Sequence, residues 1–162
     1  MRRFLVSMFL FYAIGTNAQV SYGDLFFVDY NMKINVSTEK DSIFLSVILT
    51  SSSQKMVDTP KLLLRLTDGT VISLDGTLLA STSKSDGAYM IGNVAVASNH
   101  FITEAKFPVS RNQMEQFSKG IRKLRLNTSP SFHEKQWRRD KIGKILYEKY
   151  KESSGNSFED DF

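Results

Sequence analysis

The segment that decides the fold is Phe107–Thr128, which reads FPVSRNQMEQFSKGIRKLRLNT. Ser110 and Gln113, three residues apart, form a capping box, in which each side chain bonds a backbone N–H at the start of a helix. Gly120 stands where a helix ends, because glycine adopts a left-handed backbone without a Cβ clash. The segment therefore predicts a strand, a short helix that ends near Gly120, and a second strand.

Directly after this helix the sequence takes on the period of a strand. Leu124 and Leu126 alternate with Lys123 and Arg125, which is typical of a strand with one face in the core. We expect the two leucines to face the core and the two basic residues to face solvent or a partner.

Short apolar runs before this segment indicate further strands. Ile43–Thr50 is strongly apolar, and its length favours a central strand that is covered on both faces. In Lys61–Leu74, Asp68-Gly69 separates two alternating runs and predicts a hairpin with a type I′ turn.

Further turn signals divide the chain between this hairpin and Phe107. Asp86-Gly87 follows a Ser/Thr-rich stretch, Ser81–Ser85, which we interpret as a loop. Ala88–Ala97 and Phe101–Phe107 then read as two strands that turn at Ser98-Asn99.

The C-terminal part of the sequence predicts a helix from about Glu134 to Glu152. Apolar residues recur there at helical spacing and form one stripe that we expect to dock on the sheet: Ile142, Ile145, Leu146 and Tyr150. Gly143 lies within the stripe, where it permits close packing against a neighbour.

These elements predict a mainly β fold, namely an antiparallel β-sandwich or open barrel with a short capped helix and a C-terminal helix. We expect a single β-rich domain over residues 19–152. Residues 153–162 are polar and acidic, and we expect this tail to be disordered.

The N-terminus has the pattern of a signal peptide over residues 1–18. Arg2 and Arg3 precede an eleven-residue apolar run, Phe4–Ile14, which is too short to span a membrane. Small and polar residues follow, and we expect cleavage after Ala18. The leader predicts export to the periplasm or beyond the cell, with no transmembrane helix after cleavage.

Two motifs, FPVSxxQMxxFxxGIxKLRL and RDKIGKILY, resemble small exported proteins of Bacteroidetes whose function is uncharacterised. The similarity covers about residues 100–150, and the junction Asn17-Ala18-Gln19 resembles the leaders of that group. The resemblance implies a fold and a compartment and implies no reaction.

Several chemistries are disfavoured by the residues themselves. The chain has no cysteine, which excludes disulfides, thiolate zinc sites and thiol catalysis. His100 and His133 would form a metal site only if the fold joined them with a carboxylate, and we expect neither a metal nor a cofactor. We interpret Asp68, Asp75 and Asp86 as turn residues rather than calcium ligands.

Positive charge is concentrated in one segment, because residues 119–151 carry 11 Lys and Arg against 3 Asp and Glu. We expect part of this segment to form a basic face made of Arg122, Lys123, Arg125, Arg138, Lys141 and Lys144. Such a face suits an anionic glycan, a lipid headgroup or an acidic protein partner. Export makes a nucleic acid partner unexpected, and an ordinary solvated surface is the competing interpretation.

The most favoured function is a non-enzymatic binding or interaction module with no catalytic residues. The alternative is a small hydrolase that acts on envelope or dietary polymers through carboxylates assembled by the fold. Trp137, Phe132, Tyr147 and Tyr150 would suit a platform for a sugar ring, although such aromatics more often attach a terminal helix to a sheet.

Overall fold

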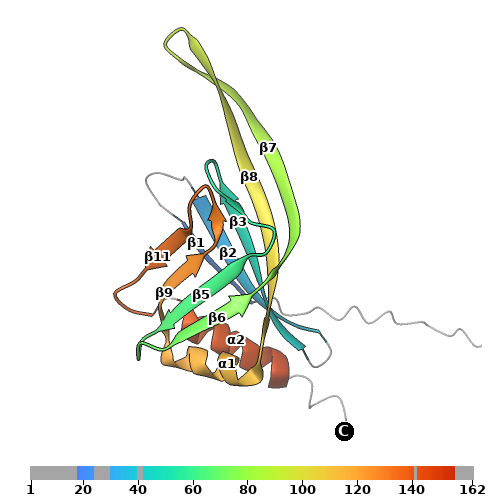
Figure 1. Ribbon diagram of the computed structural model, residues 1–162, viewed down its shortest axis with the longest axis vertical. Helices are drawn as coiled ribbons and strands as arrows, with labels where there is room; N and C mark the ends of the chain where they lie inside the picture. The colour runs from blue at the N-terminus through green and yellow to red at the C-terminus, as the bar shows by residue number, and fades with distance from the viewer. Residues whose placement is uncertain (1–17, 24–29, 40–41, 141, 156–162) are drawn as a thin grey trace, which may run out of the picture.

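The chain forms two main antiparallel sheets that pack face to face, with two helices across one end (Figure 1). A computed structural model describes residues 18–23, 30–39, 42–140 and 142–155. The predicted leader therefore lies outside the described residues except for Ala18, and so does the tail from residue 156. The mainly β, sandwich-like fold expected from the sequence is confirmed.

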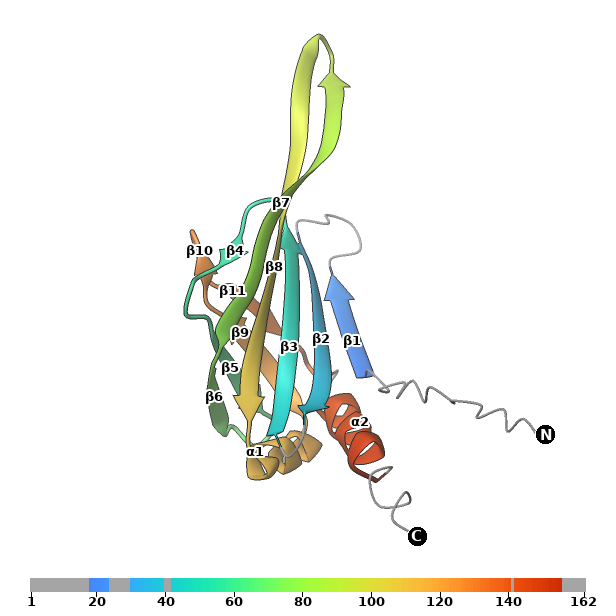
Figure 2. The same cartoon turned by 90° about the vertical axis from the view of Figure 1, so that its right-hand side faces the viewer.

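The larger sheet has five strands in the order β1-β2-β3-β8-β7. Their bounds are β1 Ala18–Gly23, β2 Tyr30–Glu39, β3 Ser42–Ser51, β8 Val94–Val109 and β7 Thr77–Ile91. The apolar run at 43–50 is the central strand, as predicted, but the prediction that both of its faces are covered is wrong. Phe44 and Ile48 are only half-buried, since no described element lies over that face (Figure 2).

The smaller sheet has four strands in the order β11-β9-β5-β6. Their bounds are β11 His133–Gln136, β9 Ile121–Leu126, β5 Lys61–Leu66 and β6 Val71–Asp75. Two short strands, β4 Lys55–Met56 and β10 Thr128–Ser129, pair with each other beside it.

The hairpin of β5 and β6 is confirmed, but its turn is not the predicted type I′. The Leu66 N–H donates to the Thr70 carbonyl at 2.8 Å, and the Gly69 N–H donates to the Leu66 carbonyl at 3.1 Å. These bonds close a three-residue loop with Gly69 at φ 90°. The Asp68 carboxylate accepts from the Thr70 N–H at 2.9 Å and so favours the longer loop.

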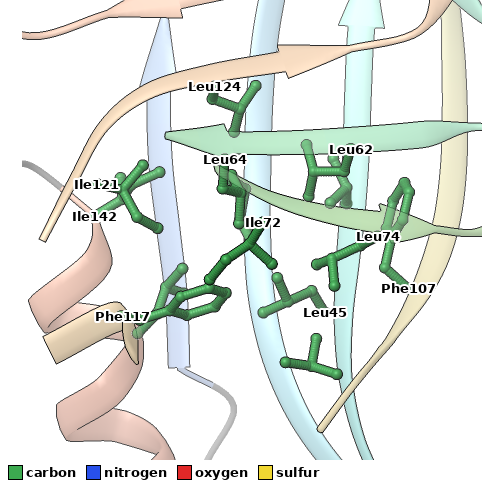
Figure 3. Close-up of a cluster of buried hydrophobic side chains, with 14 of the residues drawn as sticks. Leu45, Leu62, Leu64, Ile72, Leu74, Phe107, Phe117, Ile121, Leu124 and Ile142 are labelled. Carbon is green, nitrogen blue, oxygen red and sulfur yellow. The ribbon is translucent and has the colours of Figure 1, made fainter. Parts of the chain in front are cut away.

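The core lies between the two sheets (Figure 3). Leu62, Leu64 and Leu124 of the smaller sheet are buried opposite Leu45 and Phe107 of the larger sheet. Residues that alternate with these leucines point outward, so the smaller sheet presents a second face to solvent.

The chain passes from the smaller to the larger sheet at Gly76, between β6 and β7. The Gly76 N–H donates to the Pro60 carbonyl at 2.8 Å. A Cβ atom at this position would lie 2.5 Å from a ring carbon of Phe107. The core aromatic therefore occupies the space that any larger residue would need.

The capped helix is confirmed as α1, Arg111–Gln116, continued by the 3-10 turn η1, Phe117–Lys119. Both halves of the capping box form, because the Gln113 N–H donates to the Ser110 hydroxyl and the Ser110 N–H donates to the Gln113 side chain. Met114 and Phe117 are fully buried, and the turn ends at Gly120.

The C-terminal helix, α2, spans Gly143–Gly155, so its predicted start near Glu134 is wrong. Residues 133–136 instead form β11, because pairing with β9 satisfies their backbone groups. The Asp140 carboxylate accepts the N–H groups of Ile142, Gly143 and Lys144 and thereby caps the helix. The last three residues of α2 fall within the stretch predicted to be disordered.

Three of the four predicted stripe residues are buried, namely Leu146 and Tyr150 of α2 and Ile142 directly before it. Ile145 is 44% exposed, so its predicted place in the stripe is wrong. Gly143 does permit close packing, because a Cβ there would lie 2.7 Å from the Ile121 backbone nitrogen.

Strands β7 and β8 overturn four predictions for residues 77–109. The predicted loop at Ser81–Ser85 and the predicted turns at Asp86-Gly87 and Ser98-Asn99 all lie within these two long strands. The strands turn at Gly92 and Asn93, so Ala88–Ala97 is not the single strand that was predicted. Much of this hairpin is exposed on both faces, so it shows no polar/apolar alternation by which a strand is recognised.

Candidate anion-binding face

The outward face of the smaller sheet gathers three cations from two neighbouring strands. Register places Arg65 of β5 opposite Lys123 of β9, and Leu63 opposite Arg125. On its other side Arg65 lies opposite Val71 of β6. We call these five residues the basic face: Leu63, Arg65, Val71, Lys123 and Arg125.

The same five residues line a shallow cavity of about 130 Å³. Its lining joins two aliphatic side chains to one ammonium group and two guanidinium groups. Guanidinium groups bind carboxylate, sulfate or phosphate oxygens in pairs, and aliphatic groups cover the apolar part of a ligand. This combination suits an anion attached to an uncharged body.

One carboxylate reduces the charge of the basic face. Glu134 of β11 lies 2.7 Å from the Lys123 ammonium and 2.6 Å from the Arg125 guanidinium. Its hydrogen bonds with Lys123 and then with Arg125 hold the pKa of the Glu134 carboxyl below its usual value. Glu134 is therefore ionised at neutral pH and competes with any anion for these two cations.

Arg65 has no ion-pair partner within the described parts of the chain. It is exposed, and its guanidinium is available to a ligand. Arg125, in contrast, packs on an aromatic ring, because its guanidinium lies 4.2 Å from the centre of the exposed Phe132 ring. The basic face thus offers one free and two partly neutralised cations.

The remaining predicted basic residues lie outside this group of five. Arg122 is the extra residue of a bulge in β9, where its carbonyl accepts from the Trp137 N–H at 2.8 Å. Arg138 is exposed in the connection between β11 and α2, and Lys144 is exposed in the first turn of α2. Lys141 lies outside the described residues.

Arg65 was missed because its place beside Lys123 depends on a pairing between distant parts of the chain. Its alternation with Leu64 and Leu66 already predicts an outward side chain. The β5–β9 register that places it beside Lys123 leaves no local pattern in the sequence.

Two further charged groups of the basic segment, Lys119 and Asp140, have partners within the chain. Lys119 bonds Asp68 at 2.8 Å, and this contact, with the Thr70 N–H, lowers the pKa of Asp68 to about 2. Burial alone would raise the pKa of Asp140, but four backbone N–H donors outweigh burial and lower it. Every carboxyl with a shifted pKa in the described regions is therefore shifted toward the ionised form.

The two histidines lie on different sheets. His133 of β11 is buried, and burial, followed by the charge of Lys135, lowers its pKa to about 4. His100 of β8 pairs with Asp86 of β7. Across residues 18–23, 30–39, 42–140 and 142–155, no three His, Asp or Glu side chains are grouped as a metal site requires.

The aromatic residues considered for a sugar platform have separate surroundings. Tyr150 is buried, and Trp137 and Tyr147 pack against the core. Phe132 is 53% exposed and lies beneath Arg125. The packing of three of these rings against the core agrees with the alternative given for them, that such aromatics attach a terminal helix to a sheet.

No protein-family model, curated protein or solved structure matches the chain. None of the helices in the described regions has the length and apolar character needed to cross a membrane.

Proposed function

We propose that this protein is an exported, non-enzymatic binding module whose basic face holds an anionic group, with an anionic glycan as the favoured ligand. The observation that carries the proposal is the convergence of Arg65, Lys123 and Arg125 around a shallow cavity that also contains Leu63 and Val71. A sulfated or uronate sugar offers both parts of the matching chemistry, since its anion meets the cations and its ring carbons meet the aliphatic side chains.

The shifted carboxylates bear on the hydrolase alternative. A glycoside hydrolase needs a carboxyl that stays protonated near neutral pH as its general acid. The shifted carboxyls of the described residues are held ionised by Lys119, by Lys123 with Arg125, or by backbone donors. The hydrolase alternative therefore gains no support from them.

The test is binding of the mature protein to sulfated and uronate oligosaccharides and, separately, to anionic lipid vesicles. Binding by charge weakens as salt screens the field over about 8–10 Å near physiological ionic strength. We expect the double variant Lys123→Glu with Arg125→Glu to lower affinity at least tenfold, roughly 1.4 kcal/mol or more. Arg65→Ala removes a cation without an ion pair and is expected to weaken binding while leaving folding unchanged.

Two further variants sharpen this experiment. Glu134→Gln removes the competing carboxylate and is expected to raise affinity. This change is opposite in direction to the change expected of the other variants. Arg111→Glu, an exposed charge reversal at the start of α1, is the matched control and is expected to leave affinity unchanged. Binding that does not respond to Arg65 or to Lys123 with Arg125, or no binding at low salt, would overturn the proposal.

A further inference from the structure

The β7–β8 hairpin extends well beyond the rest of the larger sheet (Figures 1 and 2). The last residue of β3, Ser51, pairs with Phe101. Beyond that pair, β8 from Val94 to His100 pairs only with β7, from Ile91 back to Lys84. We call residues 84–100 the arm.

The end of the arm is apolar and carries no charge. Residues 87–99 read GAYMIGNVAVASN and contain no Asp, Glu, Lys or Arg. Met90, Ile91 and Val94 are 60–64% exposed. Register places Ile91 opposite Val94 and Met90 opposite Ala95, so apolar residues occur on both faces.

Such an arm is poorly suited to stand alone in water. A two-stranded hairpin is marginally stable in isolation and gains stability from a third strand or an apolar cover. Each outer edge of the arm also presents backbone N–H and C=O groups without a neighbouring strand among the described residues. The arm therefore offers both an apolar surface and free strand edges.

The two edges differ in their protection against pairing. The β7 edge carries Lys84 and Asp86, and it is interrupted by a bulge with Asp86 as its extra residue. Charges and bulges are features that keep an edge strand from pairing with another chain. The β8 edge has no charge, no proline and no extra residue from Val94 to Asn99.

We propose that the β8 edge of the arm pairs antiparallel with the same edge of a second copy of this chain. The product is a four-stranded sheet in the order β7-β8-β8-β7 about a two-fold axis. Antiparallel pairing of identical strands is self-complementary, so one surface serves both partners. The new pairing continues along the edge of β8 that already binds β3 within the larger sheet.

A second copy fits the arm better than a lipid surface does. Hydrocarbon would cover Met90, Ile91 and Val94 but would leave the backbone groups of both edges without hydrogen-bond partners, which is strongly unfavourable in an apolar medium. A strand from another copy covers part of the apolar surface and also bonds the β8 backbone. The proposal involves none of the basic-face residues and is independent of the proposed function.

The first test is the mass of the mature protein by sedimentation, over about a hundredfold range of concentration. We expect a dimer, and we expect Val96→Lys, which places a charge in the paired segment, to halve the mass. Ser83→Lys, the same type of change on β7 below the arm, is the matched control and should remain dimeric. A monomeric wild type, or a Val96→Lys variant that stays dimeric, would overturn the proposal.

The second test uses the absence of cysteine from the chain. Single cysteines introduced in turn from Val94 to Asn99 should form intermolecular disulfides most readily near one position, where the strand crosses its own copy on the two-fold axis. Ser83→Cys should not cross-link. Uniform cross-linking along the segment would contradict a defined register.

A lipid surface is tested by flotation with neutral vesicles. If the protein were a monomer that floats with the vesicles, and Val96→Lys abolished this flotation, the arm would bind lipid and the proposal of a second copy would be overturned.

Discussion

His133 and Glu134 are neighbours on β11 with opposite surroundings, because one points into the core and the other points onto the basic face. His133 is 4% exposed, whereas Glu134 is exposed and forms ion pairs with Lys123 and Arg125. Alternation along one strand therefore places a neutral imidazole in the core and an ionised carboxylate on the basic face.

The buried imidazole predicts a dependence of stability on pH. Burial, with the Lys135 charge, lowers the pKa of His133 from 6.5 to about 4, so the unfolded chain takes up the proton first. The stabilisation is fully present above about pH 6.5 and is lost as the pH falls toward 4. From this group we expect the free energy of unfolding to decrease by about 2 kcal/mol between about pH 7 and pH 5.

Urea denaturation at the two pH values measures this effect in the wild type and in His133→Gln, which does not titrate. The variant is expected to lose less stability on acidification than the wild type does. Equal losses in the two proteins would show that His133 is not the group responsible.

Helix α2 depends on a close approach to the turn before β9. Gly143 faces the Ile121 backbone nitrogen and the Phe117 carbonyl oxygen, which would lie 2.7 Å and 2.9 Å from an added Cβ. Alanine favours an isolated helix over glycine by about 1 kcal/mol. Here the clash is with backbone atoms, so we expect Gly143→Ala to destabilise the protein by about 1–3 kcal/mol.

Chemical denaturation checks the sign of this change. Glu148→Ala, at an exposed position of the same helix, is the control and should change stability by less than about 0.5 kcal/mol. A stabilised Gly143→Ala protein would mean that the helix shifts away from η1 without cost.

The elements that the sequence predicts well are those set by neighbouring residues. Ser110 with Gln113 defines the start of α1, and Asp68-Gly69 marks the β5–β6 hairpin, because both depend on bonds within a few residues. The start of α2 was placed too early. Asp140 before an apolar position is a recognisable helix-start signal, but pairing with β9 determines that residues 133–136 are a strand.

At the scale of the whole molecule, the features that define its surfaces are non-local. The fold class followed from the number and spacing of strands, and the outward direction of Lys123 and Arg125 followed from alternation. That Arg65 lies beside these two residues can be known only from the register between β5 and β9. The sequence predicts turns at both ends of Ala88–Ala97 and one strand between them, because strands exposed on both faces lack the alternation that reveals a half-buried strand and its register.

The two proposed surfaces occupy different parts of the molecule. The basic face lies on the outside of the smaller sheet, whereas the arm extends from the larger sheet beyond the end of β3. A dimer joined through the arms would therefore carry two basic faces. A ligand with repeated anionic groups would engage both when its length spans them, which raises the apparent affinity without new contacts.

The central claim, that the basic face binds an anion, is tested most directly by nuclear magnetic resonance. A sulfated oligosaccharide is titrated at low salt into the isotopically labelled mature protein while backbone amide shifts are followed. We expect the saturable shift changes to cluster at Leu63, Arg65, Val71, Lys123 and Arg125, and to disappear in Arg65→Ala combined with Lys123→Glu and Arg125→Glu. Saturable changes that cluster on the larger sheet or the helices, or no changes at all, would contradict the account.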